Sequence, residues 1–292
     1  MPIDILPSKR QGLYFLEHCR VSQVDEHIVY SKSQKKVVQF FSIPVKNTSV
    51  ILLGSGTSIT QAAVRQLGDS GVMIGFTGGD GSPLFMGSMS EYRPNEYFFS
   101  YLKIWQDEEK RLEMAKVFQI YRADFVLQAW KKFGYRFDSL NKISDTFKQK
   151  ITLANTNQQI MEAEGKFASS LYQLNAQLLG CEFARKPGQK DENDRFNSYL
   201  DNGNYLAYGL ASVVLWTYGL PFQMAVNHGY TRRGAMVFDV ADIIKDGVIM
   251  PAAMKAAADG LSRSEMRKLC IENIQNNKTL DYLFETLKHC LS

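Results

Sequence analysis

A change in the hydrophobic pattern near Pro94 divides this 292-residue chain into two parts. Before it, short runs of aromatic and β-branched residues are separated by polar, glycine-bearing turns, which is typical of β-strands. After it, apolar residues such as Phe98 and Trp105 recur at helical spacing, and charged residues take the opposite face. Strands segregated from helices predict an α+β fold rather than a doubly wound α/β fold. We therefore expect an N-terminal β-rich domain, 1–93, followed by a larger all-helical domain, 94–292.

Local signals inside the first part predict several strands and one helix. Thr57 or Ser58 is expected to cap that helix, because their hydroxyls can accept a hydrogen bond from a first-turn amide. The glycine-rich run G-S-G-T-S before it lacks the lysine of a nucleotide-binding loop, and T-G-G-D-G-S-P is typical of a tight turn. The expected strands are 14–21, 28–30, 37–41, 50–53 and 71–76, and the expected helix is 59–67.

The composition excludes several classes of protein. With 45% hydrophobic and 22% charged residues, the chain can bury real cores and is not of the disordered class. A formal net charge of +4 permits a nucleic-acid partner only through local basic patches. The four cysteines, Cys19, Cys181, Cys270 and Cys290, form no C-x-x-C pair, which argues against a disulfide framework and a zinc knuckle and fits the cytoplasm.

An uncharged stretch at 206–226 is long enough to cross a membrane. It contains Gly209, Gly219 and Pro221, however, and the sequence G-L-P is a helix stop. We therefore expect a buried core helix followed by a turn, and no membrane partner.

Glu164 lies on the apolar stripe of a helix expected at 160–178. It follows Ile160 by four residues and precedes Phe167 by three, so all three share one face. A buried carboxylate is costly unless a cation, a metal or strong donors compensate it. A structural salt bridge or an edge of the stripe that reaches water is the alternative, and this helix alone does not exclude it.

A second group of polar residues surrounds His228, in the sequence A-V-N-H-G. Asp239 and Asp242 follow within V-F-D-V-A-D-I-I-K, three residues apart, and could share one helical face among apolar neighbours. A helix cap is the alternative role for Asp239. Together with Glu164, these residues form a ligand set for Mg²⁺ or Mn²⁺, and the imidazole tilts the choice toward Mn²⁺ over Mg²⁺, with Zn²⁺ less favoured.

Basic residues near this set could neutralise phosphates beside the metal. Arg232, Arg233 and Lys245 lie close in sequence to His228 and Asp242. Each of them could equally belong to a solvated basic face. A metal held here could polarise a phosphodiester and orient an attacking hydroxyl.

The order of several motifs resembles the integrase family of CRISPR spacer acquisition, most closely its subtype I-F branch. The first part carries L-E-H-C-R-V, L-L-G-S-G-T-S-I-T-Q-A-A-V-R and G-F-T-G-G-D-G-S-P-L-F. The second carries A-E-G-K, N-H-G and F-D-V-A-D-I-I-K. Each motif is modest by itself, but their order and spacing together are specific, and the resemblance covers nearly the whole chain.

The resemblance implies a catalytic helical domain in which Glu164, His228 and Asp242 bind the metal. Asp239 matches a second acid beside the site, and Lys245 a basic residue near the two acids. The reaction implied is the insertion of short DNA duplexes into a CRISPR array by attack of a 3′-hydroxyl, with activity on branched DNA as well.

Further implied contacts involve DNA and protein partners. Arg65 matches a position that contacts DNA in relatives, and His18 one that places a ring against the end of the captured duplex. The N-terminal domain is expected to serve dimerisation and DNA contact. The expected partners are the spacer precursor duplex, the CRISPR leader and repeat, a second copy of the chain, and a second adaptation protein fused to a helicase-nuclease.

Three departures from relatives leave the metal triad untouched, and the first two concern the path of the DNA. Ser58 and Pro83 stand where some relatives carry arginine. Phe238 keeps the aromatic ring that is usual before the first acid but lacks its hydroxyl. The competing functions are a stand-alone metal nuclease for branched repair intermediates, a catalytically silent DNA-binding scaffold, and a small-molecule metallohydrolase. The intact metal triad argues against the scaffold.

Overall fold

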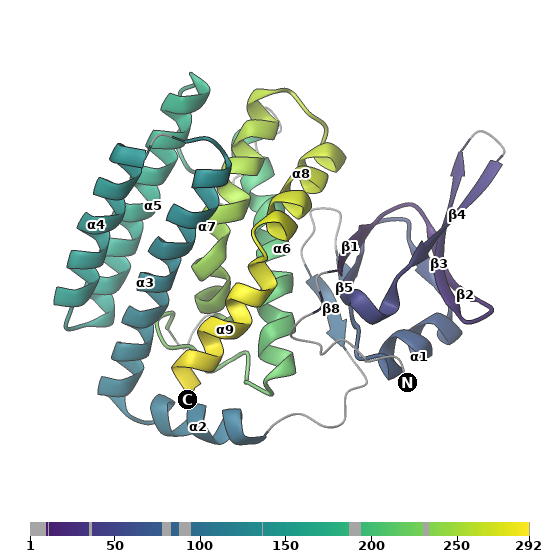
Figure 1. Ribbon diagram of the computed structural model, residues 1–292, viewed down its shortest axis with the longest axis horizontal. Coiled ribbons are helices and arrows are strands. Elements are labelled where there is room, and N and C mark those ends of the chain that lie inside the picture. Colours follow the sequence, from purple (N-terminus) through teal and green to yellow (C-terminus); the bar gives the residue numbers. More distant parts are fainter. Residues whose placement is uncertain are drawn as a thin grey trace. The chain divides into compact units, whose positions relative to one another are not determined.

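The computed structural model shows two compact units, residues 1–93 and 94–292 (Figure 1). The strands and one short helix, α1, belong to the first unit, and the second unit is helical. The α+β class predicted from the change of pattern is therefore confirmed. The structure describes residues 10, 12–34, 37–77, 83–87, 95–135, 137–186, 194–229 and 234–291.

Two four-stranded sheets build the described part of the N-terminal unit. The first has the order β1-β5-β7-β8, with β1, β5 and β7 parallel and β8 antiparallel to β7. The second has the order β4-β3-β2-β6. Helix α1 (Gln61–Asp69) lies between β5 and β7 in sequence, as a parallel connection requires. The strands are β1 (Gly12–Leu16), β2 (Arg20–Val24), β3 (His27–Gln34), β4 (Val37–Ile43), β5 (Thr48–Leu53), β6 (Ser58–Ile59), β7 (Met73–Thr77) and β8 (Pro83–Gly87).

Both sheets and α1 contribute to one apolar core. Val21 and Ile28 from the second sheet, Ile51 from the first, and Leu67 from α1 are all fully buried in it. These residues come from the aromatic and β-branched runs that predicted strands, because such side chains fill a half-buried pleated surface.

Two local predictions in this unit are wrong. The run 14–21 is not one strand, because the chain turns at His18, whose φ is +48°, and β1 and β2 join different sheets. The cap of α1 is Thr60, whose hydroxyl accepts from the amide of Ala63 at 3.3 Å. Thr57 instead donates its hydroxyl to the carbonyl of Leu16 at 3.1 Å, since Ser58–Ile59 is drawn into the sheet as β6.

The second unit is a bundle whose centre is α7. This helix contacts α3, α5, α6, α8 and α9, and most of its side chains are buried. Gly247 lets α3 approach closely, because a Cβ there would lie 2.7 Å from the ring of Phe125. The helices are α2 (Asn95–Trp105), α3 (Glu108–Lys132), α4 (Phe137–Leu153), α5 (Asn157–Leu179), α6 (Arg195–Thr217), α7 (Ala235–Ala258), α8 (Arg263–Asn276) and α9 (Thr279–Leu291).

The uncharged stretch at 206–226 is the second half of α6 and the turn after it. Leu206, Leu210 and Val214 are buried, and the chain turns at Gly219 with φ +67°. The predicted core helix with a following turn is confirmed. Across the described residues, no helix combines the length and the apolar character needed to cross a bilayer.

Candidate active site

Four elements of the helical unit bring the candidate site together: α3, α5, α7 and the segment before α7. On α5, Ile160 and Phe167 are buried, and Glu164 lies between them with 16% of its side chain exposed. On α7, Asp242 retains only 4% exposure. These carboxylates face each other because α5 packs against α7, and each occupies the apolar face that buries its helix.

Arg122 of α3 is the fixed cation of the site. Its side chain is 1% exposed, and Nη1 lies 3.0 Å from Oε1 of Glu164 and 4.0 Å from Oδ2 of Asp242. Nε and Nη2 both donate to Oδ2 of Asp246, at 2.8 and 2.5 Å. Trp130 donates to the backbone carbonyl of Asp246 at 2.8 Å, which holds this part of α7 against α3. A buried guanidinium with these partners restrains both helices and compensates the buried carboxylates.

The Glu164 and Asp242 carboxylates interact directly, and their pKa values shift in opposite directions. Burial raises the pKa of Glu164, more than the nearby Arg122 guanidinium lowers it. Burial also acts on Asp242, but Lys245 and Arg122 outweigh it and hold the pKa of Asp242 well below its usual range. Lys245 donates to Oδ1 of Asp242 at 2.5 Å and keeps 20% of its side chain exposed. Two carboxylates this close repel each other when both are ionised, and a bound cation relieves that repulsion.

Asp239 organises the segment that carries His228. Its Oδ2 accepts from the amides of Val226 and Asn227, at 2.7 and 3.1 Å, and its Oδ1 accepts from the amide of His228 at 3.1 Å. The same Oδ1 lies 2.6 Å from Nδ1 of the His228 ring. The helix-capping role considered for Asp239 is wrong, since the N-cap of α7 is Gly234. Asp239 fixes the ring through Nδ1, which leaves Nε2 for a ligand.

The imidazole of His228 is half-buried and surrounded by negative charge. Burial disfavours its protonated form, but the hydrogen bond to Asp239 and the nearby Asp239, Asp242 and Glu164 carboxylates outweigh that cost. The pKa of His228 therefore lies above its ordinary value. A site that favours a proton on this ring also favours a bound cation.

The donor set fits a divalent cation in its chemistry. Four carboxylates, those of Glu164, Asp239, Asp242 and Asp246, meet two permanent cations, Arg122 and Lys245, which leaves an excess of negative charge. Within the described ranges, no three His, Cys, Asp or Glu side chains are already gathered in a coordination geometry. The side chains of Lys245 and Arg122 hold these carboxylates instead.

Asn227 supplies an independent sign of a missing ligand. Its Nδ2 points to Oε2 of Glu164 at 3.4 Å, while its Oδ1 is buried with no hydrogen-bond partner in the part of the chain that the structure describes. A buried acceptor without a donor is costly, and a water on a bound ion would satisfy it.

The structure gathers some of the predicted residues and not others. Glu164, His228, Asp239, Asp242 and Lys245 meet in the helical unit. The two arginines Arg232 and Arg233 lie outside the described residues.

Two predicted DNA contacts belong to the N-terminal unit. Arg65 is exposed on α1, where it lines a hollow together with Gln23 and Glu26. His18 is exposed at the turn between β1 and β2, with its ring against Gly56.

Sequence reasoning missed Arg122 and Asp246. The signal was present, because Arg122 follows Phe118 by four residues and precedes Phe125 by three, and so lies on a buried face as Glu164 does. Asp246 likewise follows Asp242 by one helical turn. The inference made for Glu164 on α5, that a charged side chain on an apolar face is buried and needs a partner, applies equally to Arg122 on α3.

Comparison with known proteins identifies relatives along nearly the whole chain. The family model "CRISPR associated protein Cas1" matches residues 13–266. A "CRISPR-associated endonuclease Cas1" of Pectobacterium atrosepticum is 38% identical, over 99% of this chain and 94% of that protein. One of Pseudomonas aeruginosa, with the same description, is also 38% identical, over 97% of this chain and 94% of its own.

Solved structures share the fold at lower identity. A Cas1–DNA complex, "TtCas1-DNA", has a TM-score of 0.62 at 23% identity and covers 99% of both chains. A casposase bound to its integration product has a TM-score of 0.68 at 15% identity, covering 91% of this chain and 82% of that one. A Cas6-RT-Cas1–Cas2 complex has a TM-score of 0.64 at 14% identity, covering 95% and 34%. At these identities the likeness shows the fold.

Proposed function

Because this chain belongs to the Cas1 family of CRISPR-associated proteins, we propose that it is a metal-dependent DNA integrase and endonuclease that inserts short duplexes into a CRISPR array. One observation carries the proposal beyond the family: two buried carboxylates, Glu164 and Asp242, interact directly beside a histidine whose ring is oriented by Asp239. The relatives that are 38% identical are described as endonucleases, which supports an enzyme rather than a silent scaffold.

The proposed reaction is a transesterification. The free 3′-hydroxyl of a short duplex attacks a phosphodiester at the leader end of the array. A bond forms between the attacking oxygen and phosphorus, and the bond from phosphorus to the 3′ oxygen of the target strand breaks. The proton lost by the attacking hydroxyl is matched by one gained at the leaving oxygen. One phosphodiester bond replaces another, so no external energy source is needed. A second attack on the other strand completes the insertion.

Glu164, Asp242 and Nε2 of His228 would hold the divalent cation, which is Mg²⁺ or Mn²⁺ by the chemistry of this donor set. When bound, it would supply Lewis-acid stabilisation of the charge that develops on the phosphodiester. The imidazole favours Mn²⁺ somewhat over Mg²⁺.

The remaining residues of the site position the proposed metal ligands and compensate their negative charge. Asp239 keeps Nδ1 of His228 engaged and ties the segment 226–228 to α7. Arg122 restrains Glu164 from α3 while it is anchored on Asp246. Lys245 is the partly exposed cation of the set, so it can exchange Asp242 for a phosphate of the DNA.

The partners proposed for the chain are DNA, a second copy and a second adaptation protein. Structural relatives have been solved as a Cas1–DNA complex and as a complex that includes Cas2. The fusion of the second protein to a helicase-nuclease follows from the subtype I-F resemblance. The chain itself is proposed to be a soluble enzyme of the cytoplasm.

Dimerisation is proposed to use the edge strand β4 of the N-terminal unit. Val38 and Phe40 lie two residues apart, and so on one face, and are 53% and 63% exposed. Phe41, on the other face, stacks on Tyr30 with ring centroids 5.0 Å apart. An exposed apolar edge strand is a surface for pairing with another chain.

A strand-transfer assay tests the proposed function. The purified protein is mixed with branched DNA that carries a free 3′-hydroxyl, in Mn²⁺, Mg²⁺ or chelator. Glu164→Gln should lower the rate by about 100-fold or more, as the loss of a group that stabilises the transition state does. The matched control is Glu162→Gln, an exposed acid on the same helix, which should retain activity.

Each result of the assay has a separate meaning. Metal-dependent rejoining that only Glu164→Gln lacks supports the integrase. Cleavage without rejoining favours the stand-alone nuclease for branched DNA. Equal activity of both variants, or activity in chelator, overturns the assignment of the site.

A further inference from the structure

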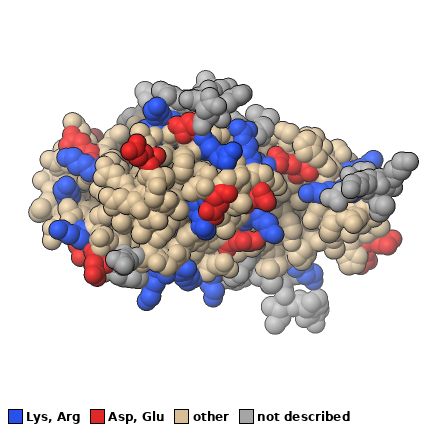
Figure 2. All heavy atoms as spheres, turned by 90° about the horizontal axis from the view of Figure 1, so that it is seen from above, with Lys and Arg blue, Asp and Glu red and all other residues tan. Residues whose placement is uncertain are grey.

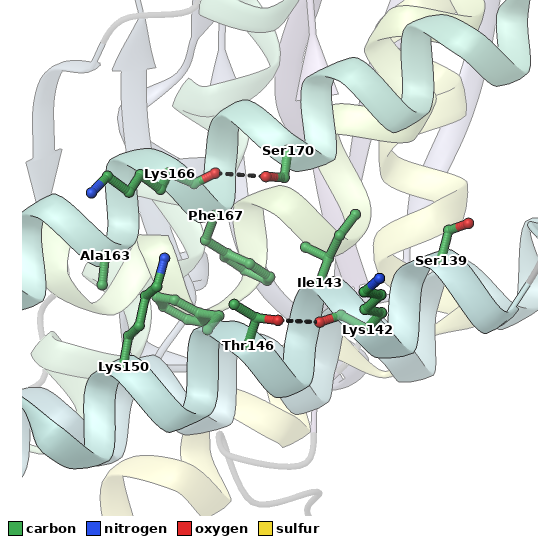
Figure 3. A pocket seen from close by; sticks show the side chains of 10 residues that line it. Ser139, Lys142, Ile143, Thr146, Lys150, Ala163, Lys166, Phe167 and Ser170 are labelled. Carbon is green, nitrogen blue, oxygen red and sulfur yellow. Dashed lines mark hydrogen bonds between the residues drawn. The ribbon is translucent and has the colours of Figure 1, made fainter.

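A groove of about 340 Å³ runs between α4 and α5, outside the site described above (Figure 3). Lys142 and Lys150 of α4 and Lys166 of α5 line it, and Figure 3 shows these side chains on the two helices that border it. A second hollow of about 250 Å³ continues it and shares Lys150 and Lys166. The two hollows form one surface, which we call the α4–α5 groove.

The α4–α5 groove carries an excess of positive charge, because three lysines and one carboxylate line it. The side chains of Lys142, Lys150 and Lys166 are exposed, and within the described residues no ion pair engages them. Glu162 is the one carboxylate among the lining residues of the two hollows, and it accepts a hydrogen bond from Gln158. On the face drawn in Figure 2, Lys and Arg are interspersed with Asp and Glu.

The floor of the groove is apolar and closed. Phe147 and Phe167 stack with ring centroids 4.1 Å apart and an angle of 6° between planes, and each is 2% exposed. The hydroxyls of Thr146 and Ser170 donate to carbonyls of their own helices. Nucleobases therefore cannot stack on the rings, and the charged donors that a ligand meets are lysine ammonium groups. Such a surface recognises a polyanion by charge, without reading its sequence.

The spacing of the lysines suits a nucleic-acid backbone. Lys142 and Lys150 are eight residues apart on one helix, which places them about 12 Å apart along its axis. A strand of a duplex advances about 3.4 Å per nucleotide, so this distance spans three to four phosphates. Lys166 lies across the groove on α5, where it can contact the same backbone.

The position of the groove separates it from the reacting phosphodiester. Lys166 follows Glu164 by two residues, and a rotation of about 200° on the helix turns the two side chains to different sides of α5. A strand in the groove would thus lie on a different side of α5 from one at the proposed metal ligands. Integration needs two DNA segments held at once, and the groove offers the second hold.

We propose that the α4–α5 groove binds the sugar-phosphate backbone of DNA at a point away from the reacting strand. The inference rests on the proposed function in one respect, namely that the polyanion is DNA. It assigns to α4, which contributes nothing to the metal site, the role of a sequence-independent clamp.

The test compares two triple variants of the full chain. The first variant removes the three positive charges that line the groove, by Lys142→Gln, Lys150→Gln and Lys166→Gln together. Lys110→Gln, Lys255→Gln and Lys268→Gln together remove equal charge from exposed surface pairs elsewhere on the same unit. The affinity for a fluorescein-labelled duplex is measured by anisotropy over a series of KCl concentrations.

In the groove variant, the magnitude of the negative slope of log K against log [KCl] should decrease by about 2.7. Each of three phosphates left without its lysine accounts for about 0.9. The control should change it by less than about one. Lys→Arg at the three groove positions should restore the slope, which separates loss of charge from loss of fold. An unchanged slope in the groove variant, or an equal change in both variants, overturns the inference. Loss of polyglutamate binding with DNA binding intact also overturns it, in favour of an acidic protein segment.

The strand-transfer activity of the wild-type protein is read in the same preparations. If the wild type lacks metal-dependent rejoining while the groove variant loses its slope, the proposed function fails and the groove stands. If the wild type rejoins DNA while the groove variant keeps its slope, only the groove inference fails.

Discussion

The two units of the molecule differ in what their cores contain. In the described part of the N-terminal unit, no carboxylate is buried, and polar side chains such as those of Ser49 and Thr77 are satisfied by backbone carbonyls. The helical unit buries Asp239, Asp242 and Asp246 at 2–3% exposure. Burying ionised groups is costly, so a core that tolerates several of them reflects chemistry rather than stability. The contrast supports the proposal that the reaction takes place in the helical unit, with surface contacts proposed for the N-terminal one.

The largest expected effect breaks the charge balance of the helical core. Arg122→Met leaves Asp246 and Glu164 buried without their cation, and should lower the free energy of unfolding by about 3–5 kcal/mol. Urea unfolding measures the change. Lys148→Met is the control, because it breaks an exposed pair with Asp124, where the cost should stay below about 1 kcal/mol. Equal losses in the two variants would contradict a structural role for the buried cation.

The next effect separates activity from stability within the same core. Asp239→Asn keeps the shape of the side chain but weakens the hold on His228 and its neighbouring amides. Metal affinity and strand transfer should each fall by about 10–100-fold, as for other residues that orient a ligand. Mn²⁺ titration followed by electron paramagnetic resonance measures binding without relying on activity. Asp259→Asn, at the exposed end of the same helix, should change neither quantity, and a metal affinity unaltered in Asp239→Asn would refute the orienting role.

A smaller effect is expected on the N-terminal surface. Val38→Ser with Phe40→Ser removes two exposed apolar side chains from β4, and the dimer should dissociate at a concentration at least about tenfold higher, since each is worth more than about 1 kcal/mol when covered. Light scattering over a dilution series reports the change. Phe99→Ser, an equally exposed aromatic of the helical unit, is the control. If both variants associate as the wild type does, β4 is not the interface.

The smallest effect concerns a single charge. Arg65→Ala should weaken DNA binding with a salt slope reduced by about 0.9, the value for one phosphate contact. Arg20→Ala removes another exposed arginine of the same unit and should leave the slope as it is. A slope unchanged by Arg65→Ala takes Arg65 out of the phosphate contacts.

Periodicity and local chemistry in the sequence were enough to predict much of this protein. The helix around Glu164 and the core helix that ends before Gly219 both follow from spacing within a few turns. The inward direction of Glu164 follows in the same way, because a helix fixes which residues share a face. The resemblance to the integrase family added the partners and the reaction.

The tertiary structure alone decided which buried charges meet. Arg122 and Asp246 are 124 residues apart in sequence, and the sequence around either residue does not predict that the two form a pair. The split of 14–21 into two strands likewise depends on which sheet each half joins, and the cap at Thr60 depends on β6 entering that sheet first. Local sequence patterns determine which side chains share a face of a helix or strand, because the period of each element is set within a few residues. Partners across the core depend on how the helices pack together, and the role of Asp239 as the support of His228 emerged only there.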